Sequence, residues 1–117
     1  MIGFGTEIRN LRERLSKDSK EFSVRRVAAK IGVEPAYLSK VEREVVPPPS
    51  EVKIIALAKV LGADEDVLLA LAGKVSSDLL RIIKDRPILF AELIRKLKEE
   101  PDHAVLRVVR EVKDGDW

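Results

Sequence analysis

The sequence predicts an all-α protein, and three observations support that fold class. Apolar residues recur at spacings of three and four along most of the chain, which is the period of an amphipathic helix. Glycine, proline and residues that favour helix N-caps separate these stretches. Aromatic residues are only 4% of the 117 residues, so the material for a core is Val, Leu, Ile and Ala. No strand-like alternation competes with the helical pattern.

Five short helices are expected within residues 1–73. The first follows Thr6, whose hydroxyl group is a suitable N-cap, and it buries Ile8, Leu11 and Leu15 on one face. The polar residues that follow Leu15, up to residue 21, break this periodicity and are expected to form a loop.

The second and third helices lie close together in the sequence. Ser23 is expected to cap Val24–Ile31, and Gly32 is expected to end that helix in a left-handed conformation. Pro35 stands where proline is tolerated, in the first turn of a third helix that runs to about Arg43.

A stiff connector of three prolines, residues 47–49, precedes the fourth helix. Ser50 is expected to cap that helix and Gly62 to end it. The acidic residues 64–66 suit the positive end of the dipole of a fifth helix, Glu65–Ala72.

Residues 74–117 are expected to be a helical extension of the domain formed by residues 1–73. The pattern predicts three more helices: Asp78–Lys84 after a Ser77 cap, Ile88–Glu99, and Asp102–Val112.

Composition excludes several kinds of site. The chain has no cysteine, so it has neither disulfides nor thiolate metal sites. Its single histidine, His103, and the acidic residues 64–66 are expected to be ordinary surface residues, so we expect no metal, no cofactor and no enzymatic activity. The absence of a signal peptide or a long apolar run favours a cytoplasmic protein with no membrane partner.

The charge of the chain is only weak evidence for a nucleic-acid partner. The formal net charge is only +2, but the first 46 residues carry ten Lys or Arg against seven Asp or Glu. This bias is compatible with contact to phosphate groups.

The most informative stretch is residues 23–43, where two short helices meet at a glycine turn. Small residues in the first of these helices, Ala28 and Ala29, would let the second helix cross closely. The apolar residues expected between the two helices are Ile31, Val33, Leu38 and Val41. This is the pattern of a helix-turn-helix, whose second helix can enter the major groove of DNA.

The chain resembles the Cro/CI-type (XRE-type) helix-turn-helix family of repressors over about residues 6–72. The clearest match is the run Tyr37-Leu38-Ser39-Lys40-Val41-Glu42-Arg43. The other matching residues are Ile8, Leu11, Arg12, Val27-Ala28, Gly32-Val33, Pro49-Ser50, Leu57-Ala58, Leu61-Gly62 and Leu68-Leu69. The resemblance implies a five-helix, lambda-repressor-like domain that binds double-stranded DNA.

The resemblance also implies roles for single residues. Lys40 occupies a position that faces bases and can donate to guanine O6 and N7, whereas Pro35 and Ala36 offer only apolar contact. Tyr37 and Arg43 fall at phosphate-contacting positions, although Tyr37 suits packing equally well. The DNA-binding residues expected on this basis are Ser23, Val24, Arg25, Pro35, Ala36, Tyr37, Ser39, Lys40 and Arg43, and Arg12 with Glu42 is expected to be a structural ion pair.

Three features depart from the family pattern. Val24 replaces a glutamine that often supports phosphate and base contacts. Glu44 replaces the glycine that usually follows the Glu-Arg pair. The loop between the first two helices is several residues longer than usual, and it either carries Lys17 and Lys20 towards the DNA backbone or is simply solvated.

We therefore expect a transcriptional regulator, a repressor that binds a palindromic operator as a homodimer. The last helices carry more apolar surface than they can hide alone, so they either pack onto the first five helices or form the dimer interface. The expected interface residues are Leu89, Phe90, Leu93, Ile94, Leu97, Val105, Leu106 and Val109. An alternative is an antitoxin, in which the same DNA-binding unit autoregulates its operon and the C-terminal segment binds a toxin. A small-molecule sensor is a weaker alternative, because no convergent polar groups mark a pocket.

Overall fold

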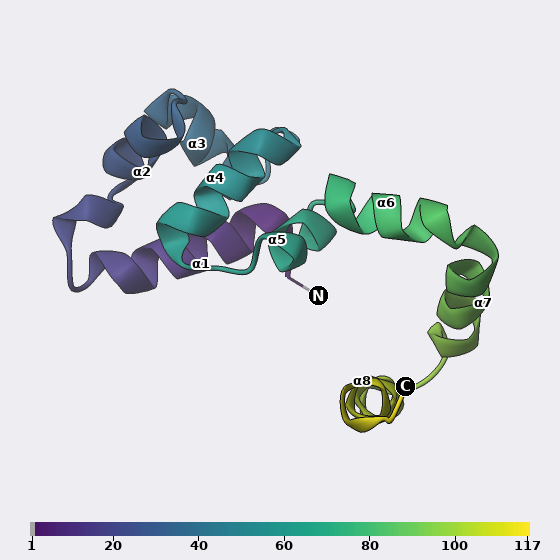
Figure 1. The fold of residues 1–117 in the computed structure, drawn as a ribbon. Coiled ribbons are helices and arrows are strands. Elements are labelled where there is room, and N and C mark those ends of the chain that lie inside the picture. Colours follow the sequence, from purple (N-terminus) through teal and green to yellow (C-terminus); the bar gives the residue numbers. More distant parts are fainter. Residues whose placement is uncertain (1) are drawn as a thin grey trace. The chain divides into compact units, whose positions relative to one another are not determined.

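The computed structural model describes residues 2–117 and confirms the prediction of an all-α protein (Figure 1). The described residues form eight α-helices and one short 3₁₀ helix, with no strand. The chain divides into two compact units, of which the first ends at Ser76 and the second is Ser77–Trp117. Among the described residues, no helix has the length and apolar character needed to cross a membrane.

The first unit is built around one apolar core. Its elements are α1 (Phe4–Ser16), the 3₁₀ helix η1 (Lys20–Phe22), α2 (Val24–Ile31), α3 (Pro35–Glu42), α4 (Glu51–Leu61) and α5 (Glu65–Leu71). All five α-helices contribute to the core, which consists of Phe4, Ile8, Val27, Ala28, Ile31, Leu38, Val41, Ile54, Leu57, Ala58, Leu61, Leu68 and Leu69. Since fully burying one Leu, Ile or Val side chain is worth about 1.5–3 kcal/mol, this core is the main source of stability for the unit.

Side-chain and glycine caps fix the ends of α2 and α4 as the sequence predicts. The Ser23 hydroxyl accepts a hydrogen bond from the Arg26 backbone N–H at 3.1 Å, and the Ser50 hydroxyl accepts one from the Lys53 N–H at 3.4 Å. Gly32 follows α2 with a φ of 74°, which is the left-handed conformation that glycine adopts without steric cost.

The prediction that Thr6 caps α1 is wrong. The helix begins at Phe4, and Gly3 occupies the N-cap position without a side-chain cap. Phe4 is buried in the core, and its burial favours a helix that begins at this residue. The Thr6 hydroxyl does not cap the helix but donates to Glu44 Oε2 at 2.6 Å. The stretch expected to be a loop is also partly helical, since α1 extends to Ser16 and η1 begins at Lys20.

The second unit consists of α6 (Ser77–Asp85), α7 (Pro87–Leu97) and α8 (Asp102–Asp114). These bounds differ from the predicted ones by at most two residues, and Ser77 is the first helical residue rather than a cap before the helix. No residue of the three helices is buried. The second unit therefore has no core of its own in a single chain.

Residues 74–76 stand at the end of the first unit. Ser76 is buried, and Lys74 Nζ donates to the Pro49 carbonyl oxygen at 2.9 Å. These contacts attach residues 74–76 to the first unit.

Candidate nucleic-acid interface

Helices α2 and α3 pack closely at the turn that joins them. Ala28 is completely buried at this crossing, where a larger side chain would force the helices apart. The turn is held by two backbone hydrogen bonds, from Gly32 N–H to the Ala29 carbonyl at 3.2 Å and from Val33 N–H to the Ala28 carbonyl at 3.0 Å. Lys53 Nζ, from α4, donates to the Ile31 carbonyl at 2.8 Å. The relative orientation of α2 and α3 is thus fixed by the backbone and by a third helix.

One face of α3 is free to meet another molecule. Leu38, Val41 and Glu42 are buried, whereas Ala36, Lys40 and Arg43 are exposed. The exposed residues lie on the side of the helix opposite the core, because successive residues of a helix are 100° apart. Together they form what we call the α3 face: Ala36, Lys40 and Arg43.

Tyr37 and Pro35 lie beside this face rather than on it. Both are half-buried, and Tyr37 packs against the core. Val24, at the start of α2, is also half-buried against the core. These contacts favour a packing role for the Tyr37 ring and the Val24 side chain.

A small polar hollow of about 190 Å³ lies between three helices next to the α3 face. It is lined by Val24 from the start of α2, by Ser39 and Arg43 from α3, by Arg9 and Glu13 from α1, and by Arg12 and Glu42. The hollow therefore brings Ser39 and the first turn of α2 to one place beside Arg43. The family resemblance did not identify Arg9 or Glu13 as site residues. Their four-residue spacing on α1 nevertheless indicates that they share a face of that helix.

Arg12 and Glu42 form a buried ion pair beneath this hollow. Arg12 Nε and Nη2 donate to the two carboxylate oxygens of Glu42 at 2.7 and 2.8 Å. This two-pronged hydrogen bond raises the pKa of Arg12 above its usual value, although burial acts in the opposite direction. Arg12 Nη1 also donates to the Phe22 carbonyl at 3.2 Å. One guanidinium group thus joins α1 to the end of α3 and to η1.

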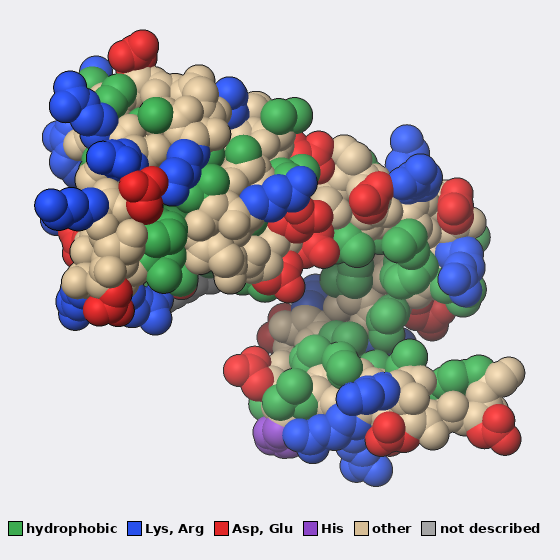
Figure 2. Space-filling model, turned by 60° about the vertical axis from the view of Figure 1, so that its left-hand side comes forward, with side chains coloured by type: hydrophobic (Ala, Val, Ile, Leu, Met, Phe, Trp, Pro, Cys, Tyr) green, Lys and Arg blue, Asp and Glu red, His purple; other side chains and the backbone are tan. Residues whose placement is uncertain are grey.

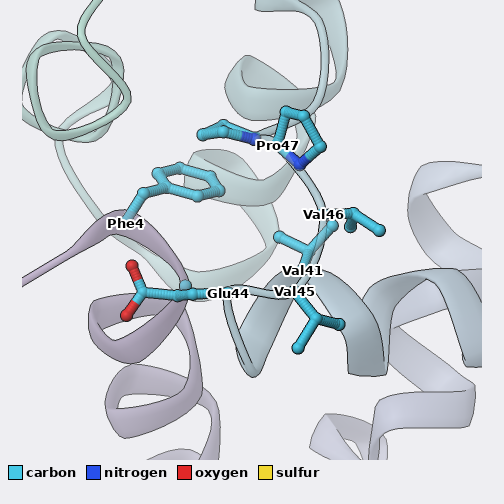
Figure 3. A pocket seen from close by; sticks show the side chains of 8 residues that line it. Phe4, Val41, Glu44, Val45, Val46 and Pro47 are labelled. Carbon is cyan, nitrogen blue, oxygen red and sulfur yellow. The ribbon is translucent and has the colours of Figure 1, made fainter.

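Glu44 adopts the backbone conformation that a glycine would provide. Its φ is 59°, and its N–H donates to the Val41 carbonyl at 3.0 Å, while the Val45 N–H donates to the Lys40 carbonyl at 3.1 Å. This pair of bonds is a Schellman cap, which ends α3 in the usual way. Figure 3 shows that the Glu44 carboxylate extends towards the first turn of α1, beside an open pocket of about 380 Å³.

The cations near the interface divide into paired and unpaired groups. Arg26 and Lys30 both pair with Glu21, at 2.7 and 3.5 Å, and Arg9 pairs with Glu13 at 2.8 Å. The hydrogen bond from Arg9 lowers the pKa of Glu13, so this carboxylate stays charged and neutralises Arg9.

Within residues 2–117, Arg25, Lys40 and Arg43 are exposed and form no ion pair. Figure 2 shows Lys and Arg side chains gathered towards the left-hand edge of the first unit. The unpaired members of this group are the positive charges available to an external anion.

The family-model comparison matches the helix-turn-helix domain over residues 4–71, which covers both α2 and α3 and the helices that hold them. This chain belongs to the helix-turn-helix domain family, and its first unit is consistent with an XRE/Cro-type regulator. The family is one of DNA-binding domains. No curated protein and no solved structure gives a significant match.

Proposed function

We propose that this protein is a sequence-specific transcriptional repressor that inserts α3 into the major groove of its operator. The observation that carries the proposal is the α3 face, which presents a small apolar residue and two unpaired cations on a helix-turn-helix. Ala36 is suited to contact a thymine methyl group, and Lys40 to donate to guanine O6 and N7.

Two cations, Arg43 on the α3 face and Arg25 on α2, are assigned to the DNA backbone rather than to bases. Arg43 and Arg25 are exposed cations suited to phosphate oxygens, which fix the register of a protein on DNA. The backbone N–H groups after Ser23 begin α2, and helix N-termini favour phosphate. Ser39 lines the hollow beside Arg43, where its hydroxyl is suited to add a hydrogen bond to a base.

Selection of bound duplexes from a random pool tests the proposal directly. We expect an enriched inverted repeat whose half-sites contain an invariant guanine. Lys40→Ala should weaken binding to that repeat by about 1–3 kcal/mol and relax the preference for the guanine. Lys59→Ala, which removes an exposed lysine of α4, is the matched control and should bind as the unchanged protein does. No enrichment at low salt would contradict the proposal.

The second part of the proposal is that the second unit forms a homodimer. Many of its apolar side chains are exposed in the single chain: Leu89 is 61% exposed, Ile94 55% and Val109 57%. Figure 2 shows hydrophobic side chains gathered on this unit. The full proposed interface is Leu89, Phe90, Leu93, Ile94, Leu97, Val105, Leu106 and Val109. A two-fold dimer places two recognition helices about one turn of DNA apart, which explains why an operator would be palindromic.

Sedimentation analysis of two variants tests this interface. Ile94→Glu places a charge among the apolar side chains of α7, so we expect a monomer that binds an inverted repeat more weakly and a single half-site as before. Arg95→Glu changes the neighbouring residue on the polar side of α7 and should leave the dimer intact. If the unchanged chain is monomeric at micromolar concentration, the homodimer is wrong, and a different protein partner such as a toxin becomes the better explanation of the apolar surface.

A further inference from the structure

The segment between α1 and α2 is held in a defined place. The Ser19 hydroxyl accepts a hydrogen bond from the Glu21 N–H at 3.2 Å, and the Phe22 ring packs against the core. The Phe22 carbonyl accepts the bond from Arg12, and Lys30 Nζ lies 5.2 Å from the centre of the Phe22 ring. These attachments hold the backbone of the segment in a defined place.

Lys17, at the start of this segment, lies along α1 from the hollow beside the α3 face. Arg9, Glu13 and Lys17 follow one another at steps of four along α1, so they share a face of that helix. Arg9 and Glu13 line the hollow that also holds Ser39 and Arg43, and Glu13 and Lys17 line the next hollow along α1.

Lys20 is the first residue of η1, which leads directly into α2. It stands four residues before Val24, which lines the hollow beside Arg43. The four intervening peptide units span at most about 14 Å. Lys17 thus lies one hollow away from the surface assigned to DNA, and Lys20 lies within about 14 Å of that surface along the chain. Neither residue belongs to the α3 face.

The charges of this segment leave both lysines available. Glu13 is held by Arg9, and Glu21 is shared between Arg26 and Lys30. Lys17 and Lys20 are exposed and form no ion pair with any residue in the described part of the chain. Asp18 is the nearby acid that also has no ion pair there, so it reduces the local positive charge without removing it.

We infer that Lys17 and Lys20 form a second phosphate-binding element. It contacts the DNA backbone outside the base pairs that α3 reads. The ligand is a pair of phosphodiester groups, since a lysine ammonium is a point charge that attracts phosphate without selecting a base. This inference rests on the proposed DNA-binding function. The second element would increase the affinity for DNA and its dependence on salt, without changing which sequence is preferred.

The test compares the unchanged protein with a Lys17→Ala/Lys20→Ala variant on the duplex obtained by selection. Each phosphate contact contributes about one unit to the slope of log affinity against log salt concentration, so the variant should lose about two units for each half-site. Its ranking of mutated operators should stay the same. Lys59→Ala is the control and should keep the full slope.

Two further measurements separate this inference from a folding defect and from the proposed function. Removing the base pairs that flank the half-site should weaken the unchanged protein but not the double variant. Asp18→Asn should strengthen binding at low salt, which a damaged fold would not do. If the unchanged protein selects an operator while the double variant keeps the same slope and the same penalty for shortened DNA, the second element is wrong and the proposed function stands. If the unchanged protein selects no DNA, the proposed function itself fails.

Discussion

At the scale of single residues, Glu44 shows how a family glycine can be replaced without losing the turn. A left-handed conformation costs a residue with a Cβ about 1–2 kcal/mol. The hydrogen bond that Thr6 donates to the Glu44 carboxylate offsets part of this cost. The carboxylate also lies near the start of α1, where the helix dipole favours a negative charge. The departure at this position therefore leaves the end of α3, and the placement of Arg43, intact.

Substitutions at Glu44 separate the backbone cost from the side-chain contact. Glu44→Ala should destabilise the protein by about 1 kcal/mol, because it removes the bond to Thr6 and keeps the strained backbone. Glu44→Gly should be more stable than Glu44→Ala by about 1 kcal/mol, because glycine adopts this conformation freely. Urea unfolding of the two variants measures the difference. An alanine variant as stable as the glycine variant would show that the residue is not held in the left-handed region.

At the scale of elements, the buried pair of Arg12 and Glu42 joins α3 to α1. The pair is almost free of solvent, with side-chain exposures of 9% and 4%. Removing one member of a buried pair leaves the other charge without compensation, which costs more than the pair contributes when it is intact. The same guanidinium holds Phe22, so α3 and the segment before α2 depend on one side chain.

A double-variant cycle tests this role. Arg12→Met should lower the free energy of unfolding by about 3–5 kcal/mol, because Glu42 is then buried and unpaired. Combining it with Glu42→Leu should recover most of the loss, since two apolar residues of similar size can pack in the same space. Chemical denaturation of the single and double variants gives the coupling energy. Independent, additive effects would mean that the two side chains do not act as a pair.

At the scale of the whole molecule, the two units differ in what holds them together. Every residue that is buried within the described chain lies at or before Ser76. Helices α6, α7 and α8 expose apolar side chains that a stable unit would cover. The first unit has a buried core of its own, whereas the second unit would complete its core only in the proposed homodimer.

Cutting the chain after Ser76 should therefore give unequal fragments. Residues 1–76 should unfold cooperatively and remain monomeric, and they should bind an inverted repeat more weakly than the full chain because they lack the dimer contacts. Residues 77–117 should gain helicity as their concentration rises, because folding then requires association. Circular dichroism at several concentrations checks both expectations. A 77–117 fragment that is fully helical when dilute would contradict the proposed need for a partner.

The sequence by itself determined the helices, because their signals are local. Each of these signals depends on residues no more than a few positions apart. They are the helical periodicity, the Ser23 and Ser50 caps and the left-handed Gly32. The helix-turn-helix followed from the same short-range pattern, and it is the part of the fold that the family match supports.

Only the tertiary structure decided the features that join distant residues. The early start of α1 depends on Phe4 entering the core, and on Gly5, where a Cβ would lie 2.1 Å from the Val41 carbonyl oxygen. The inward packing of Tyr37 likewise depends on helices brought together by the fold. Which cations remain free for DNA was decided by the surroundings of each side chain rather than by residue type, because a lysine or arginine looks the same in the sequence whether or not an acid neutralises it.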